Sequence, residues 1–313
     1  MNVEEFEFFS NYEDKVTGKL KLFGRNWRCS NAKAVILIVH GFGEHSGRYG
    51  HVAEIFNKHN IAFVAYDTRG SGRSGGERGY VPCLNAVMDD LEAAIGKVRE
   101  SKYYPDVPLI IYGHGTGCIT QLSHIQRRKS KSLLYQAMIL STPAITIAQR
   151  PSAIQYLLVK TFGYLAPHFR LPLGGNKDKR EYSTDKDVVE KYRTDPLVHD
   201  RWPAGTVSMF LQLGYEFESA IIDFPVPTLI QQGSVDTTTP AERIRAWANK
   251  AKGPKTYKEW EGFDHELHNE PEKESLFKHI LWWLNTTLNL NIESSQHPEI
   301  VPLKVLTDTI SKE

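Results

Sequence analysis

One stretch of five residues constrains the fold of this chain more than any other: Gly113-His114-Gly115-Thr116-Gly117. It follows the apolar run 107–112, which is typical of a buried strand, and it precedes a segment in which Leu122 and Ile125 have helical spacing. A strand that turns so abruptly into a helix forces the central residue into positive-φ backbone, which costs about 1–3 kcal/mol for a residue with a Cβ. Glycine avoids most of that cost. The sequence therefore predicts a strand, a sharp turn and a helix centred on Gly115.

Apolar runs alternate with amphipathic segments through much of the chain. The runs expected to form buried strands are 34–39, 61–66, 107–112, 137–141, 226–233 and 255–260. Segments with helical spacing lie between several of them, and a last helix is expected over 274–288. Because strands joined through helices run parallel, we predict an α/β fold with a central, mostly parallel sheet flanked by helices. Residues 1–33 are expected to add an antiparallel pair of strands.

The pattern changes between the apolar runs 137–141 and 226–233. Residues 144–219 contain no buried strand and are expected to form an inserted helical cap. The predicted division is 1–143 and 220–288 for the two parts of the core, 144–219 for the cap and 289–313 for a polar, loosely attached tail. The apolar stretch 154–165 has two alternatives: it packs on the core, or it is exposed and touches lipid.

Composition excludes several classes of protein. The chain has 313 residues with 38 Lys and Arg against 37 Asp and Glu, so no global charge favours nucleic acid. Its cysteines, Cys29, Cys83 and Cys118, are odd in number and widely spaced, which favours buried thiols in a reducing compartment over disulfides or a metal site. The acidic start is unlike a secretory signal, and no apolar run is long enough to span a bilayer. We therefore expect a cytoplasmic protein, peripheral to membranes at most, with no metal, cofactor or nucleic-acid partner.

The five-residue stretch matches the pattern G-x-S-x-G, which presents a nucleophilic serine, except that Gly115 stands in place of the serine. Asp236 and His265 each follow a predicted strand further along the chain, in the order acid and then histidine that accompanies this pattern. We expect both to meet Gly115 at the carboxyl edge of the sheet. The backbone N–H groups of Phe42 and Thr116 are expected to form an oxyanion hole.

Two side chains near Gly115 carry groups that could attack an ester. Thr116 has a hydroxyl and Cys118 has a thiol. Their positions, one and three residues after Gly115, are expected to point both groups away from the substrate. The sequence therefore offers no replacement nucleophile.

Several segments closely resemble the monoacylglycerol lipases, which are serine hydrolases of the α/β-hydrolase superfamily with lysophospholipase-like and esterase members. They are His40-Gly41-Phe42-Gly43-Glu44-His45-Ser46-Gly47-Arg48-Tyr49, the loop 67–77, Asp195-Pro196-Leu197-Val198, Gly233-Ser234-Val235-Asp236 and His265-Glu266-Leu267-His268. The resemblance covers about residues 7 to 288. It implies an α/β-hydrolase fold with a helical cap and the hydrolysis of monoacylglycerol or lysophospholipid esters.

The resemblance also implies how a lipid would bind. Glu44, Arg48 and His268 would form the polar end of a pocket that receives the glycerol head group. The cap would open on an apolar acyl tunnel and rest against a membrane. A few polar groups at one end of an apolar cavity would orient such an amphiphile. For Glu44 and Arg48 the alternative is a local salt bridge.

The turn 113–117, which corresponds to the nucleophile elbow of these hydrolases, departs from the family pattern. That pattern reads Gly-His-Ser followed by a residue such as Met and two glycines. This chain has Gly115, Thr116 and Cys118 where the serine, the Met-like residue and the second small residue would stand. We therefore expect the chain to be inactive or nearly so.

Three hypotheses remain. The chain is an ester hydrolase in which Gly115 is an engineered replacement or a sequence error, or it is a natural pseudoenzyme that binds a lipid in order to sense or carry it. The third is an aminopeptidase or another hydrolase with a different cap, against which the string from Glu44 to Arg48 argues.

Overall fold

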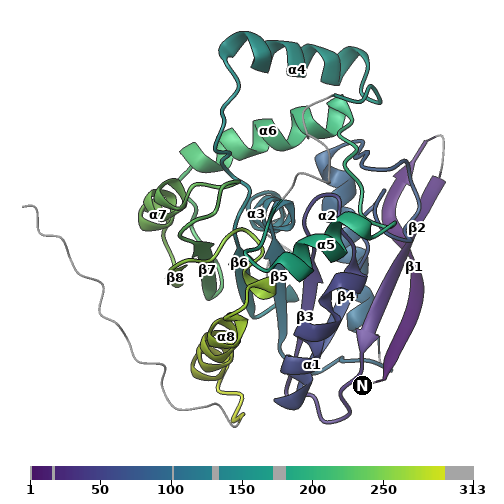
Figure 1. Cartoon of the computed structure of the whole chain (residues 1–313). Helices are drawn as coiled ribbons and strands as arrows, with labels where there is room; N and C mark the ends of the chain where they lie inside the picture. The colour runs from purple at the N-terminus through teal and green to yellow at the C-terminus, as the bar shows by residue number, and fades with distance from the viewer. Residues whose placement is uncertain (1, 16–17, 101, 129–133, 172–180, 293–313) are drawn as a thin grey trace, which may run out of the picture.

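The computed structural model describes residues 2–15, 18–100, 102–128, 134–171 and 181–292 (Figure 1). Most of the predicted tail, from residue 293 onward, lies outside the described residues. Within the described part of the chain, no helix combines the length and the apolar character needed to cross a bilayer.

The strands form one sheet in the order β1-β2-β4-β3-β5-β6-β7-β8. Their bounds are Val3–Asp14 (β1), Gly18–Trp27 (β2), Ala34–Val39 (β3), Ile61–Tyr66 (β4), Leu109–His114 (β5), Ala137–Ser141 (β6), Thr228–Gly233 (β7) and Lys255–Trp260 (β8). β1 and β2 pair antiparallel, and β2 runs antiparallel to β4. All pairings from β4 to β8 are parallel. The predicted α/β-hydrolase architecture, with a mostly parallel sheet and an antiparallel first pair, is confirmed.

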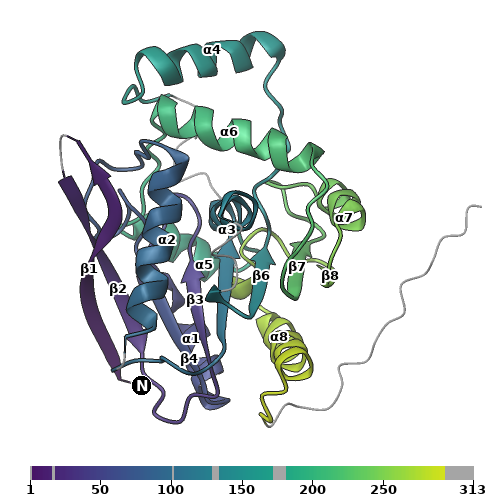
Figure 2. The same ribbon diagram turned by 180° about the vertical axis from the view of Figure 1, so that it is seen from behind.

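Helices cover both faces of the sheet (Figures 1 and 2). α1 (Gly50–Lys58) and α8 (Lys273–Leu288) pack on one face, and α2 (Leu84–Val98), α3 (Thr116–Arg127) and α7 (Ala241–Lys250) pack on the other. Alternate side chains of a strand face opposite ways. In β3, Ile36 packs with the α1 and α8 side and Leu37 with the α2 and α3 side. Double coverage explains why the strand sequences are continuously apolar.

The described residues between β6 and β7, where the sequence predicts the cap, form the helices α4 (Ala153–Leu165), α5 (Lys186–Thr194) and α6 (Ala204–Ser219). α6 lies over one end of the sheet and α4 lies outermost, on the far side of α6 (Figure 2). The rings of Tyr156 and Tyr215 meet edge to face at 5.4 Å and join these two helices. Val159 is the one buried side chain of α4. The apolar stretch 154–165 is therefore largely exposed, whereas the division of the chain into core and cap stays a prediction.

The predicted sharp turn lies between β5 and α3. Gly115 has φ 54° and ψ −116°, a backbone conformation that side chains disfavour. Gly117 is needed for a different reason: a Cβ there would lie 2.0 Å from the backbone oxygen of Val39. α3 can approach β3 closely only because this Cβ is absent. By contrast, a Cβ at Gly115 would lie no closer than 3.6 Å to its nearest neighbours.

Three Gly→Ala substitutions test this distinction. Gly117→Ala should lower the free energy of unfolding by about 3 kcal/mol or more, since the clash is with backbone that cannot rotate away. Gly115→Ala should cost only the conformational strain of about 1–3 kcal/mol. Gly96→Ala, in the middle of α2 with open space around the added Cβ, should stabilise by roughly 0.5–1 kcal/mol. Urea unfolding of the three variants measures this order, and a Gly117→Ala variant as stable as Gly115→Ala would contradict it.

Candidate active site

Loops that follow β5, β7 and β8 bring Gly115, Asp236 and His265 together at the carboxyl edge of the sheet. His265 Nδ1 donates to Asp236 Oδ2 at 2.9 Å. On its other side, His265 Nε2 lies 3.6 Å from the position that a Cβ on Gly115 would occupy. The three residues thus have the spatial order expected of an elbow, a histidine and an acid, and their roles stay predictions.

Asp236 is held by donors on both carboxylate oxygens. Oδ1 accepts from the backbone N–H of Thr238 and of Thr239, at 2.7 and 2.8 Å. Oδ2 accepts from the Thr239 hydroxyl at 2.6 Å and from the Gln232 amide at 2.8 Å, besides His265. Burial would raise the pKa of Asp236, but His265 and the Thr239 donors outweigh burial and hold the pKa well below its usual range. The carboxylate therefore stays ionised.

The His265 ring is buried, with 10% of its side chain exposed. Burial lowers the pKa of His265, but the charge and hydrogen bond of Asp236, together with the charges of Glu266 and Asp264, raise it by more, so that the net shift is upward. Nε2 makes no hydrogen bond to any residue that the structure describes. This ring nitrogen is thus free to take a proton from, or give one to, a group placed above Gly115.

A second histidine lies beside this pair and stays neutral. The ring centroids of His114 and His265 are 5.0 Å apart. Burial lowers the pKa of His114 to about 4. Its Nδ1 lies 3.1 Å from the hydroxyl of Thr142. Of the two rings, only that of His265 can carry a charge near neutral pH.

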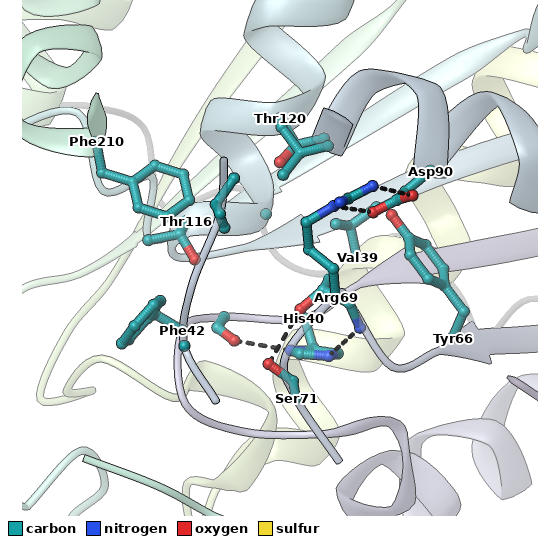
Figure 3. Close-up of a pocket in the computed structure, with 16 residues that line it drawn as sticks. Val39, His40, Phe42, Tyr66, Arg69, Ser71, Asp90, Thr116, Thr120 and Phe210 are labelled. Carbon is teal, nitrogen blue, oxygen red and sulfur yellow. Dashed lines mark hydrogen bonds and ion pairs between the residues drawn. The ribbon is translucent and has the colours of Figure 1, made fainter. Parts of the chain in front are cut away.

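Phe42 and Thr116, the predicted oxyanion-hole residues, line one cavity of about 30 Å³ (Figure 3). Neither backbone N–H has a hydrogen-bond partner among the described residues. The Phe42 ring stacks on Trp202, with centroids 4.2 Å apart. The next residue, Gly43, accepts at its carbonyl from the His199 N–H at 2.9 Å. The loop after β3 is therefore fixed against the segment that leads into α6, while the Phe42 N–H stays without a partner among the described residues.

Glu44 and Arg48 form the salt bridge that the sequence left as an alternative to head-group binding. Arg48 donates to Glu44 Oε2 at 2.9 Å and to both oxygens of Glu266 at 2.6 and 2.7 Å. The N–H of Gly41 donates to Glu44 Oε1 at 2.6 Å, so this network also positions the loop before Phe42. Burial would raise the pKa of Glu266, but the charge and hydrogen bonds of Arg48 hold it well below its usual range. These three side chains thus satisfy one another.

His268 lies next to this network, beside Tyr49. The two rings stack with centroids 4.9 Å apart, and the Tyr49 hydroxyl donates to Glu44 at 3.0 Å. Both ring nitrogens of His268 are buried without a hydrogen-bond partner among the described residues. Burial holds the pKa of His268 well below its usual value, so the ring is neutral. Glu44, Arg48 and His268 are therefore brought together, and their contact with a head group stays a prediction.

Residues that sequence reasoning missed complete the site. Tyr182 places its ring 5.5 Å from that of His265, and its carbonyl accepts from the Glu266 N–H at 2.7 Å. Arg48 lies 4.8 Å above the ring of Tyr192. Tyr182 lies in an irregular segment that gives no signal. Tyr192 lies in α5 with Val189 at helical spacing, which indicates a buried face but not what that face packs against. The run of threonines that ends in Thr239 offered a usable signal, since hydroxyls and N–H groups just after an aspartate commonly bond it.

Cys118 points away from the elbow, as predicted. Its thiol is fully buried and donates to the carbonyls of Gly113 and Ser141 at 3.2 and 3.4 Å. Burial raises the pKa of Cys118 far above its ordinary value, so the thiolate does not form near neutral pH.

Among the described residues, no cluster of three or more histidine, cysteine or acidic side chains could hold a metal ion.

Comparison with known proteins gives consistent matches. A model of the family described as serine aminopeptidase, S33, matches residues 30–272. The chain is 30% identical over 257 residues to a monoacylglycerol lipase of Mycolicibacterium smegmatis, covering 82% of this chain and 89% of that protein. It is 28% identical to the phospholipase YtpA of Bacillus subtilis, over 80% of this chain and 95% of that one. The crystal structure of a Paleococcus ferrophilus monoacylglycerol lipase superposes with a TM-score of 0.73 at 25% identity, covering 92% of this chain and all of that one.

The raised pKa of His265 can be measured directly. In an NMR titration the His265 ring should titrate above the ordinary value of about 6.5. Asp236→Asn removes the charge that favours the imidazolium, so the pKa of His265 should fall, because burial then dominates. The ring of His59, distant in sequence from the site, serves as an internal control. An unchanged or higher pKa of His265 in the Asp236→Asn variant would contradict the assignment of Asp236 as its partner.

Proposed function

Because the chain belongs to the serine aminopeptidase S33 family of α/β-hydrolases, on its monoacylglycerol lipase-like branch, we propose that it is an ester-hydrolase scaffold for monoacylglycerol or lysophospholipid whose own turnover is slow or absent. One observation carries the proposal. His265, held by Asp236, aims Nε2 at the position where a side chain on Gly115 would begin. Such a pair is built to exchange a proton with a hydroxyl at that position.

With serine at position 115, the reaction follows the usual acyl-enzyme route. The hydroxyl oxygen bonds to the ester carbonyl carbon while His265 Nε2 takes its proton, and the N–H groups of Phe42 and Thr116 stabilise the oxyanion. The bond from the carbonyl carbon to the glycerol oxygen then breaks, and His265 returns the proton to that oxygen. Water releases the fatty acid by the same steps.

Gly115 removes the attacking oxygen and leaves the other parts in place. The one remaining route is direct attack by water, with His265 taking the water proton and passing it to the departing glycerol oxygen. Oxyanion stabilisation and positioning alone sustain roughly 10³–10⁴-fold over the uncatalysed rate. Hydrolysis by the chain with Gly115 is therefore slow at best.

The polar cluster of Glu44, Arg48 and His268 supports a head-group end for the lipid site. His268 brings two buried ring nitrogens that lack protein partners, and a glycerol hydroxyl could satisfy them. Glu44 and Arg48 are already paired with each other and with Glu266, so their part is to fix the loops around the head group rather than to supply free donors. Substitution of Arg48 would leave the buried charges of Glu44 and Glu266 unpaired.

The exposed apolar surface of α4 supports a peripheral contact with membranes. Ile154, Leu157, Tyr164 and Leu165 are between 62% and 85% exposed, on the helix that lies outermost over α6 (Figure 1). A helix of this kind lies in the lipid interface with its apolar side chains inserted. Such a contact would let a lipid pass from the membrane towards the site beneath the cap helices.

A second candidate function is a lipid-binding protein without catalysis. The observation that favours it is that the Cys118 thiol is buried and bonded elsewhere, so this side chain cannot replace the serine. In this case the same site would hold the intact lipid. Hydrolysis assays separate the two candidates.

Gly115→Ser should restore hydrolysis of a long-chain monoacylglycerol, with a gain of about 10²-fold or more in kcat over the original chain, as the acyl-enzyme route returns. Adding His265→Ala should abolish the gain, whereas adding Cys118→Ala should leave it intact. Fatty acid release is quantified by mass spectrometry. A Gly115→Ser variant that folds and shows no gain would sink the hydrolase proposal and leave the lipid-binding one.

Replacing Ile154 and Leu165 with aspartate should weaken binding to phospholipid vesicles by about tenfold or more, because each exposed apolar side chain contributes roughly 1.5–3 kcal/mol when buried. Thermal stability should change little, since both side chains are exposed. Lys160→Asp, on the same helix, controls for the added charge. Vesicle co-sedimentation that is equal for the original chain and the double variant would contradict the membrane contact.

A further inference from the structure

We propose that the turn at Gly115 is a binding site for the carboxylate of a free fatty acid, with one oxygen on the N–H groups of Phe42 and Thr116 and the other on Nε2 of His265. The inference rests on the proposed function, in that it assumes an acyl chain enters this site. It goes further by naming the ionised acid, rather than an ester, as the preferred ligand.

The first support is the space above Gly115. Among the described residues, two atoms outside the turn come within 4 Å of the position of an added Cβ, namely His265 Nε2 at 3.6 Å and Gly41 Cα at 3.7 Å. Both are ordinary van der Waals distances, so a side chain would fit there without displacing anything. In its absence, this space can accept one oxygen of a ligand at the place where a serine hydroxyl would stand.

The second support is a set of donors that lack acceptors. α3 begins at Thr116 and runs for 12 residues, so its N-terminus presents unpaired N–H groups and a partial positive charge to the turn. The N–H groups of Thr116 and Phe42 have no hydrogen-bond partner within the described chain. Independently of the helix, the His265 side chain, which is 10% exposed, places Nε2 3.6 Å from the added Cβ, and the described residues give this nitrogen no hydrogen-bond partner.

The carboxylates nearest the turn already have hydrogen-bond donors of their own. The charge of Asp236 is taken up by His265 and by the Thr238, Thr239 and Gln232 donors. Glu44 and Glu266 both face Arg48.

Asp264 is also occupied, because its Oδ1 accepts from the N–H groups of His265 and Thr237. The raised pKa of His265 also favours the imidazolium form, which is a charge-assisted donor. A bound carboxylate therefore meets donors above Gly115.

An ester or an alcohol satisfies fewer of these groups. An ester offers one good acceptor, its carbonyl oxygen, and its alkoxy group must also find room. An alcohol carries no charge for the imidazolium. A carboxylate offers two equivalent oxygens and a full negative charge, so it can serve the backbone donors and His265 at once.

The test compares decanoate with decanol, which have the same tail length and differ at the head. Both are titrated calorimetrically into the full chain at pH 7, below micelle formation. We expect decanoate to bind at least about tenfold more tightly, because it alone makes a charge-assisted hydrogen bond to His265. Equal affinity for the two ligands would overturn the proposal.

Two variants test whether the preference for decanoate over decanol depends on the groups at the Gly115 turn. His265→Gln keeps a neutral donor of similar size, so it should reduce decanoate affinity and leave decanol affinity unchanged. Gly115→Ser fills the space with a hydroxyl and should also shrink the preference for decanoate. A preference that survives both substitutions would overturn the proposal, since the carboxylate would then lie elsewhere.

Failure of the carboxylate-site proposal and failure of the hydrolase proposal give different experimental results. Monoacylglycerol hydrolysis by Gly115→Ser together with equal binding of decanoate and decanol would refute the carboxylate site and leave the hydrolase scaffold. No hydrolysis by Gly115→Ser, with decanoate preferred and the preference lost in His265→Gln, would refute the hydrolase proposal and support the carboxylate site.

Discussion

The hydrogen bond between His265 and Asp236 is the interaction on which the site depends. It joins the loops after β7 and β8, fixes which ring nitrogen of His265 carries the proton, and raises the pKa of the ring against the effect of burial. The bond can form because β7 and β8 are adjacent and parallel, so their carboxyl ends lie side by side. Four further donors hold the Asp236 carboxylate in place. The His265 ring bonded to it is therefore held in one orientation, with Nε2 free.

Short contacts arrange the other loops at this edge of the sheet around His265 and Asp236. Glu44 ties the loop before Phe42 to Arg48 and, through it, to Glu266 beside His265. The sharp turn at Gly115 directs the N-terminus of α3 to the same place. The result is a pocket edge rich in donors and lacking an attacking atom.

Much of this could be predicted from the sequence, because the informative signals are local. Continuous aliphatic runs indicated the buried strands, and the glycines around Gly115 indicated the turn. Asp236 and His265 were found because each directly follows a strand. The partners of those residues were harder to predict. Tyr182 approaches the site from an irregular segment, and Tyr192 from α5, whose spacing indicates a buried face but not its partner. The contact of Glu266 with Arg48 joins positions 218 residues apart, so no local pattern signals it. The sequence also does not decide whether α4 is exposed, because an apolar helix has the same pattern whether it is buried or exposed.

The most direct test uses a fluorophosphonate probe, which reacts with a serine hydroxyl only when a histidine and an oxyanion hole activate it. The original chain and Gly115→Ser are incubated with the probe, and labelled residues are located by mass spectrometry. If the machinery is intact and lacks only its nucleophile, the Gly115→Ser variant is labelled at position 115 and the original chain is not labelled at all. Labelling of the original chain, or no labelling of a folded Gly115→Ser variant, would contradict this account of the site.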